Sequence, residues 1–161
     1  MNFSLSRRET LALSFAGVTV AAAAATRTAA HEAVKPNQER KMRLINPTDG
    51  NYSQAVEITG FKKLVMVSGQ VGEDAEGKVP AEFRDQARLA WSNVAAQLRE
   101  AQMTVGDIVK MTIFLSDRQY RSLAYETRKE VLGEHCPAMT IIICGIYREE
   151  WLLEIEVMAA A

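Results

Sequence analysis

Hydrophobic and polar positions along the chain follow two periods, one typical of strands and one typical of helices. Alternation within DIVKMTIFLSD predicts a strand whose one face carries Val109, Met111, Ile113 and Leu115. Between residues 81 and 103, apolar positions recur at steps of three and four, which predicts one amphipathic helix. A second helix is expected from a cap at Asp117 to about Leu132, and it should end at Gly133.

Five further segments have the composition of strands: MRLINP, QAVEIT, KLVMVSG, MTIIIC and LLEIEVM. KLVMVSG is apolar on both alternating faces, with Leu64 and Met66 on one face and Val65 and Val67 on the other. The order of elements predicts an α+β fold in which two helices cover one face of a six-stranded sheet. Because the second face must also be covered, we expect it to meet another copy of the chain in a homo-oligomer.

The amino terminus has the composition of an export signal. Arg7 and Arg8 precede an apolar run of about fifteen residues, 11–25, which is too short to span a bilayer comfortably. The segment SRRETLA resembles a twin-arginine signal, although Glu9 and Thr10 depart from its usual continuation. The alternative is an uncleaved amphipathic or anchoring helix.

We predict a twin-arginine signal peptide over residues 1–30, cleaved before His31, and a flexible lead-in over 31–41 before a single domain over 42–161. The protein is then exported and periplasmic, without stable membrane anchoring after cleavage. The apolar share of 48% and the charged share of 24% are typical of a globular domain. The formal charge of −1, which cleavage makes more negative, disfavours nucleic acid as a partner.

Metal, cofactor and thiol chemistry find little support in the sequence. His31 and His135 belong to no metal-type cluster, and no phosphate-binding or dinucleotide-binding loop is present, so we expect neither a metal nor a cofactor. Cys136 and Cys144 are separated by extended chain that spans roughly 26 Å, too far for a disulfide, so buried thiols are expected. A nucleophilic pair of Cys136 with His135 is disfavoured, because adjacent residues in an extended chain point in opposite directions.

Glu154 and Glu156 lie two residues apart in LLEIEV and therefore share one face of a strand. They are either the solvated face of an edge strand, or at least one of them lines a cleft between subunits. In the second case the carboxylate would handle a proton or hold a water molecule. The pattern alone leaves both interpretations open.

Several segments together resemble the RidA family, also called YjgF or L-PSP endoribonuclease, from about Asn46 to the end of the chain. They are NYSQAVEITG, the passage from VSGQVGEDAEGKVP to VGDIVKMTIFLSD, EHCPAM and LEIEVMA. The resemblance implies a chorismate-mutase-like α+β fold with a mostly antiparallel sheet, assembled as a homotrimer with a small-molecule cleft at each subunit interface. It also implies hydrolysis of reactive enamine or imine metabolites to ammonium and a 2-oxo acid, without a cofactor.

The resemblance also implies roles for individual residues. Tyr52 and Ser68 match residues that line the family's substrate pocket, and Glu154 matches the glutamate that positions the attacking water. The arginine that binds the substrate carboxylate, in the pattern Pro-Ala-Arg, is replaced by Met139. Tyr125 stands where a smaller polar residue is common. The predicted site is therefore catalytic Glu154 with substrate-binding Tyr52, Ser68, Tyr125 and Met139.

The missing arginine bears on the choice of ligand. A charge-assisted hydrogen bond contributes roughly 1.5–3 kcal/mol, which corresponds to a tenfold to more than hundredfold effect on binding. Arg148 is interpreted as a solvated turn cation and not as a substitute. We expect a deaminase or hydrolase with altered substrate choice. The alternative is a non-catalytic trimer that binds a small molecule, for which Met139 and the run TIII favour an uncharged ligand. RNA cleavage is disfavoured by the acidic chain.

Overall fold

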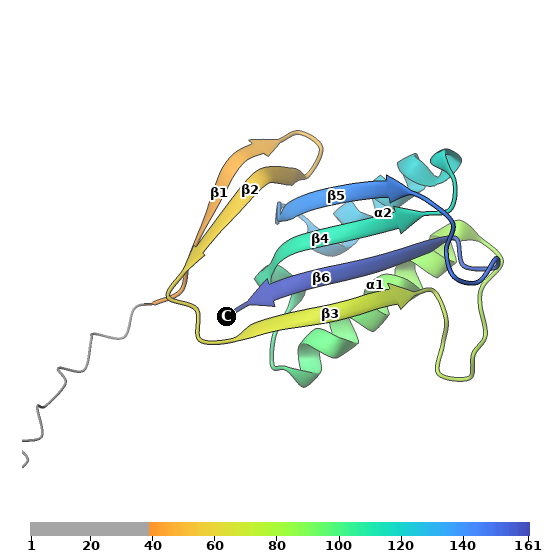
Figure 1. The fold of residues 1–161 in the computed structure, drawn as a ribbon, viewed down its shortest axis with the longest axis horizontal. Coiled ribbons are helices and arrows are strands. Elements are labelled where there is room, and N and C mark those ends of the chain that lie inside the picture. The colour runs from red at the N-terminus through yellow and green to blue at the C-terminus, as the bar shows by residue number, and fades with distance from the viewer. Residues whose placement is uncertain (1–38) are drawn as a thin grey trace, which may run out of the picture. The chain divides into compact units, whose positions relative to one another are not determined.

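The computed structural model describes residues 39–161 as an α+β fold with one sheet and two helices (Figure 1). The strands are β1 (Lys41–Thr48), β2 (Tyr52–Thr59), β3 (Leu64–Val71), β4 (Ile108–Leu115), β5 (Ala138–Ile143) and β6 (Leu153–Ala160), and the helices are α1 (Phe83–Glu100) and α2 (Arg121–Leu132). Each strand and helix predicted from periodicity is confirmed. The predicted signal peptide, and the lead-in as far as residue 38, lie outside the described residues.

The six strands form a mixed sheet in the order β1-β2-β5-β4-β6-β3. β5 runs parallel to both β2 and β4, and the other three pairings are antiparallel. The hairpin of β1 and β2 meets the rest of the sheet at one residue pair, Ser53 with Ala138. The buried Ser53 Oγ strengthens this junction by donating to the Cys136 carbonyl at 2.7 Å. This junction places the start of β2 beside the start of β5.

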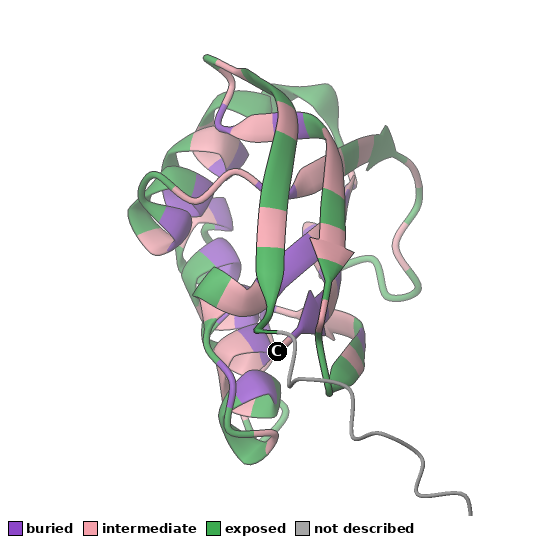
Figure 2. Cartoon of the chain, turned by 90° about the vertical axis from the view of Figure 1, so that its left-hand side faces the viewer, coloured by how far each residue is buried: buried purple, intermediate pink, exposed green. Residues whose placement is uncertain are grey.

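Both helices pack on one face of the sheet, and the core lies between the helices and this face (Figures 1 and 2). The predicted alternation in β4 is confirmed, because Met111, Ile113 and Leu115 are each at most 1% exposed. The stripe of α1 that includes Trp91, Val94 and Leu98 packs against them. Burial of these side chains is the main source of stability for the fold.

The start of α2 differs slightly from the prediction. The Asp117 carboxylate accepts a hydrogen bond from the Gln119 backbone at 2.8 Å, and so it caps a short 3-10 turn, Arg118–Tyr120, that precedes the α-helix. The 3-10 turn leads directly into α2 at Arg121. Gly133 ends the helix as predicted, with a positive φ of 56° that a residue with a side chain rarely adopts.

The sheet face opposite the helices is open in the single chain. Val65 and Val67 pack toward the helices, whereas Leu64 and Met66 are 44% and 70% exposed. Ile142, on β5, is also 42% exposed. The two apolar faces of β3 are thus confirmed, and one of them has no cover within residues 39–161. In that same range, no helix is long and apolar enough to cross a membrane.

Candidate functional site

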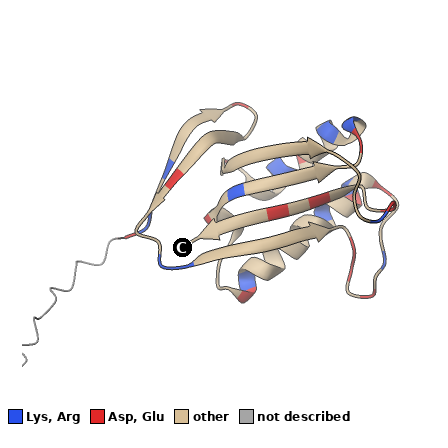
Figure 3. Cartoon of the chain, viewed as in Figure 1, with Lys and Arg blue, Asp and Glu red and all other residues tan. Residues whose placement is uncertain are grey.

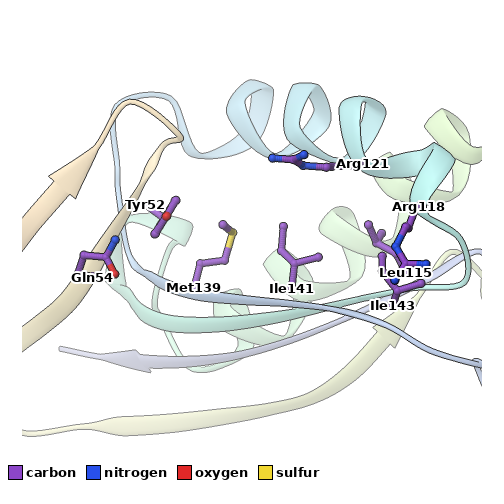
Figure 4. A pocket seen from close by; sticks show the side chains of 8 residues that line it. All are labelled: Tyr52, Gln54, Leu115, Arg118, Arg121, Met139, Ile141 and Ile143. Carbon is purple, nitrogen blue, oxygen red and sulfur yellow. The ribbon is translucent and has the colours of Figure 1, made fainter.

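A pocket of about 690 Å³ opens between β2, β5 and the start of α2 (Figure 4). Its apolar wall comes from Leu115, Met139, Ile141 and Ile143, and its polar lining from Tyr52, Gln54, Arg118 and Arg121. All charged residues in this lining are arginines. Figure 4 shows Arg121 facing Met139 and Ile141 across the opening.

Sheet register explains why Met139 faces this pocket. Met139 pairs with Met111 of β4, whose side chain is fully buried on the helix-covered face. Alternation along β5 then directs Met139 and Ile141 toward the helices. Tyr52 reaches the same pocket from the start of β2. Two of the predicted site residues, Tyr52 and Met139, are therefore brought together.

A buried arginine from α2 lies against Met139. Arg128 is only 2% exposed, and its Nη1 lies 2.9 Å from the Met139 Sδ. Its Nη2 donates to the Gly50 carbonyl at 2.6 Å, and its guanidinium stacks over the Tyr125 ring with 5.3 Å to the ring centroid. Tyr125, also a predicted site residue, thus contacts the arginine and borders a neighbouring hollow beside Asp49.

The charge of Arg128 is not balanced by a carboxylate among the described residues, where it forms no ion pair. Its Nε is buried and has no hydrogen-bond partner. Burial lowers the pKa of Arg128, and electrostatic interactions with Tyr125, Cys136 and Tyr52 oppose this effect. A guanidinium nevertheless keeps its charge in proteins, so a buried cation without an anion lies beside the pocket.

Ser68 and Glu154 lie elsewhere. Glu154 pairs with Phe114 across β4, while its neighbour Ile155 pairs with Ile113 in the core, so Glu154 faces the open side of the sheet. Ser68 is exposed in a register shift of β3 that lies alongside β6. Within one chain, the predicted site residues are therefore divided between the two faces of the sheet.

The Glu154 carboxylate occupies the space above Gly69. A Cβ built on Gly69 would lie 1.6 Å from the Glu154 Oε1, so any side chain at this position must displace the carboxylate. Gly72, three residues on, makes a different close approach, because its Cβ would meet the backbone Cα of Gln86 in α1 at 2.5 Å. The first glycine makes room for a flexible side chain and the second for a backbone.

These two glycines allow a matched prediction. We expect Gly72→Ala to reduce the free energy of unfolding by about 1–3 kcal/mol, because α1 must move away from the sheet. Gly69→Ala is expected to reduce the free energy of unfolding by much less, since only the Glu154 side chain needs to turn. Urea unfolding of both variants measures the difference, and equal losses would contradict this assignment of the two contacts.

Glu156 also faces the open side, as the sequence predicts, and contributes to a hollow that includes Lys110, Met66 and Met158. Figure 3 shows the acidic positions along β6 next to a basic position on β4. Burial lowers the pKa of Lys110, and Glu156 opposes this effect. The Lys110 Nζ donates to the Thr140 hydroxyl at 2.6 Å. The open face thus carries the carboxylates of Glu154 and Glu156 and the ammonium of Lys110 beside its apolar side chains.

Cys136 and His135 have structural contacts. The His135 Nε2 lies 2.7 Å from the Ile108 carbonyl, whereas the Cys136 Sγ contacts the Glu134 carbonyl and the Asn51 amide. These separate partners agree with the interpretation that the two side chains do not form a nucleophilic pair. Cys136 and Cys144 are free, as predicted, but both are half-buried and not fully buried.

Arg148 remains a surface cation, as predicted. It forms ion pairs with Glu73 at 2.7 Å and with Glu150, and it stacks over Trp151. Arg148 is absent from the lining of the pocket beside Met139. No group of three or more His, Cys, Asp or Glu side chains that could hold a metal ion occurs in the part of the chain that the structure describes.

Sequence reasoning missed Arg128, Arg121, Arg118 and Gln54. A signal for Arg128 exists in the sequence, because it follows Ala124 and precedes Leu132 by four residues each, and both of these side chains are buried. A charged residue on the apolar stripe of an amphipathic helix indicates a buried charge. The other three residues are exposed and are recognisable only from the pocket itself.

Residues 44–161 match the family described as Endoribonuclease L-PSP. The chain is 34% identical over 114 residues to the "putative reactive intermediate deaminase TdcF" of Escherichia coli, covering 68% of this chain and 86% of that protein. It is 31% identical over 112 residues to a RutC family protein of Pyrococcus abyssi, again covering 68% and 86%.

Solved structures agree with the sequence comparison. A crystal structure of Escherichia coli TdcF with bound serine is 32% identical and has a TM-score of 0.59, with 73% of this chain and 93% of that chain covered. The Rid-family protein YyfB of Yersinia pestis is 24% identical and has a TM-score of 0.65, with coverage of 74% and 98%, and it shows the shared fold. With its matched domain, its identity to TdcF and the fold it shares with solved members, the chain belongs to the RidA family, also called YjgF or L-PSP.

Proposed function

We propose that this chain is a deaminase that hydrolyses a small imine or enamine at clefts formed between copies of the chain. The observation that carries this proposal is the Glu154 carboxylate held above Gly69 on the open sheet face. A half-buried carboxylate at that point can accept a hydrogen bond from a water molecule. The description of TdcF as a putative reactive intermediate deaminase supports the same reaction class.

In the proposed reaction, water adds to the carbon of the C=N bond. Glu154 accepts a proton from this water as the new C–O bond forms and gives that proton to the nitrogen, which leaves a carbinolamine. The carbinolamine hydroxyl then gives its proton to Glu154 as the C=O bond forms and the C–N bond breaks, and Glu154 passes this proton to the departing nitrogen, which leaves as ammonia. The overall change converts an imino acid and water into a 2-oxo acid and ammonia, without oxidation or reduction.

The cleft requires a second copy of the chain. Ser68 and Glu154 lie on the open sheet face, whereas Tyr52 and Met139 face the helices. Side chains on opposite faces of one sheet cannot close around one small molecule. We therefore propose a homotrimer in which the open face of one copy meets the pocket edge of the next. The exposed Leu64, Met66 and Ile142 supply apolar surface for such a contact.

Met66 allows a direct test of this assembly, because its side chain is 70% exposed on the open face of β3, next to Leu64. We expect Met66→Asp to shift the protein from trimer to monomer, since an aspartate would lose its hydration at the interface. Light scattering after size-exclusion chromatography measures the mass. Tyr147→Asp is the control, because Tyr147 is 92% exposed in the loop between β5 and β6. A wild-type monomer, or a trimer that persists in Met66→Asp, would contradict the proposal.

The activity itself is tested by generating 2-iminobutyrate in the presence of the purified full chain and following its decay. We expect the decay to accelerate in proportion to protein concentration, with 2-oxobutyrate and ammonium as products. Spontaneous decay without protein sets the baseline. A rate equal to that baseline at every protein concentration would exclude this substrate.

The alternative is a trimer that binds a small molecule and does not catalyse a reaction. One observation favours it: the pocket beside Met139 is sizeable, yet Glu154 is not among its lining residues in the single chain. Calorimetry with 2-oxobutyrate, combined with the decay measurement, separates the two functions. Binding without any acceleration would select the alternative.

A further inference from the structure

We infer that Arg128 binds the carboxylate of the ligand, and that the Met139 side chain covers this arginine until the ligand enters. This inference deepens the proposed function by naming the group that the site recognises. A buried cation with no anionic partner among residues 39–161 lies directly behind a pocket whose only charged lining residues are Arg118 and Arg121. Such an arrangement matches an anionic ligand.

The hydrogen-bonding capacity of Arg128 is only partly used. Its Nη2 donates to the Gly50 carbonyl, its Nη1 contacts the Met139 Sδ, and its Nε has no acceptor. A thioether sulfur is a weak acceptor. A carboxylate that takes the place of this sulfur would accept from Nη1 through a charge-assisted hydrogen bond, which is about twice as strong as a neutral one. The exchange is therefore favourable for the arginine.

Met139 is suited to move. It lines the pocket, whereas Arg128 does not, so the methionine side chain separates the guanidinium from the pocket space. Methionine has three rotatable side-chain bonds and no branch at Cβ, while its neighbours Thr140 and Ile141 are branched at Cβ and stiff. Rotation of Met139 alone would expose Nη1 to the pocket without moving the strand.

The rest of the pocket restricts the ligand class. The wall beyond Met139 consists of Ile141, Ile143 and Leu115, which suits a short aliphatic chain (Figure 4). Arg121 faces the same opening from α2 and adds positive potential. The ligand class is thus a small aliphatic carboxylate, such as a 2-oxo or 2-imino acid. This inference differs from the expectation, drawn from Met139 and the run TIII, of an uncharged ligand.

The test uses the full chain with 2-oxobutyrate as probe and its methyl ester as the uncharged counterpart. We expect the acid to bind at least tenfold more tightly than the ester by calorimetry. In nitrogen-15 spectra, the Arg128 Nε–Hε signal is expected to shift with the acid and not with the ester. Arg128→Gln should remove the preference for the acid, whereas Arg121→Gln should reduce binding of the acid only about two- to threefold.

Met139→Ala keeps the buried arginine and removes the side chain that covers it. We therefore expect this variant to bind the acid severalfold more tightly and to bind the ester with unchanged affinity. If Arg128→Gln does not fold, the affinity of Met139→Ala for the acid tests the inference instead. Equal affinities for acid and ester, or a preference for the acid that survives Arg128→Gln and is lost in Arg121→Gln, would overturn the inference. Binding is measured without turnover, so the proposed deaminase activity can fail while this inference holds, and the reverse is equally visible.

Discussion

Met139→Arg is expected to reduce the free energy of unfolding by about 3–5 kcal/mol, although the family resemblance implies an arginine at this position. The reason is Arg128, whose Nη1 already lies 2.9 Å from the Met139 Sδ. A second guanidinium would be forced against the first, and neither would have a carboxylate partner among the described residues. Urea unfolding measures the loss.

The exchanged double variant, Arg128→Met with Met139→Arg, is expected to lose less unfolding free energy than its two single variants lose together. The expected difference is about 2 kcal/mol. It again places one guanidinium and one thioether in the same space. Some loss remains, because the Gly50 carbonyl no longer receives its bond from Arg128. Met139→Leu is the control for shape and should cost less than about 1.5 kcal/mol. Additive losses in the cycle would show that positions 128 and 139 do not interact.

Glu154→Gln is expected to lower the rate of 2-iminobutyrate hydrolysis by at least about a hundredfold, in the range typical of a lost general acid or base. Glutamine keeps the size of the side chain and its position above Gly69, but it cannot take a proton from water. The unfolding free energy should therefore change little. Decay of 2-iminobutyrate generated in the assay measures the rate.

Glu156→Gln is the matched control for this prediction. Glu156 lies on the same face of β6, two residues further on, but it shares a hollow with Lys110 and does not lie over Gly69. We expect Glu156→Gln to hydrolyse 2-iminobutyrate at a rate within about threefold of the wild-type rate. If the substrate decays only at the protein-free rate with both wild type and Glu154→Gln, with binding of 2-oxobutyrate retained, the protein belongs to the binding alternative. Equal rates above that baseline would remove Glu154 from the proposed reaction.

Most of the fold could be predicted because its elements are defined by local periods. The alternation in β4 and the spacing in α1 identify a strand and a helix directly, and the two apolar faces of β3 indicated an open sheet face. The α-helix α2 begins later than predicted, because Asp117 caps a 3-10 turn that precedes it.

The candidate site was predicted only in part. Resemblance pointed to Tyr52, Ser68, Tyr125, Met139 and Glu154, but it could not say that they lie on two faces of the sheet. That division depends on which strands pair and in which register. Register is decided by long-range hydrogen bonding, and a shift of one residue would move every side chain to the other face.

The sequence by itself determined the strands and helices, the family and the methionine at position 139, because periodicity and residue identity are properties of the chain alone. Only the tertiary structure decided which side chains surround that methionine. Arg128 is eleven residues away along the chain, on a different element, and packing of α2 against β5 brings its guanidinium to the Met139 sulfur. A charge that is missing from a strand can be supplied by a helix packed on that strand, since a ligand responds to positions in space and not to order in the sequence.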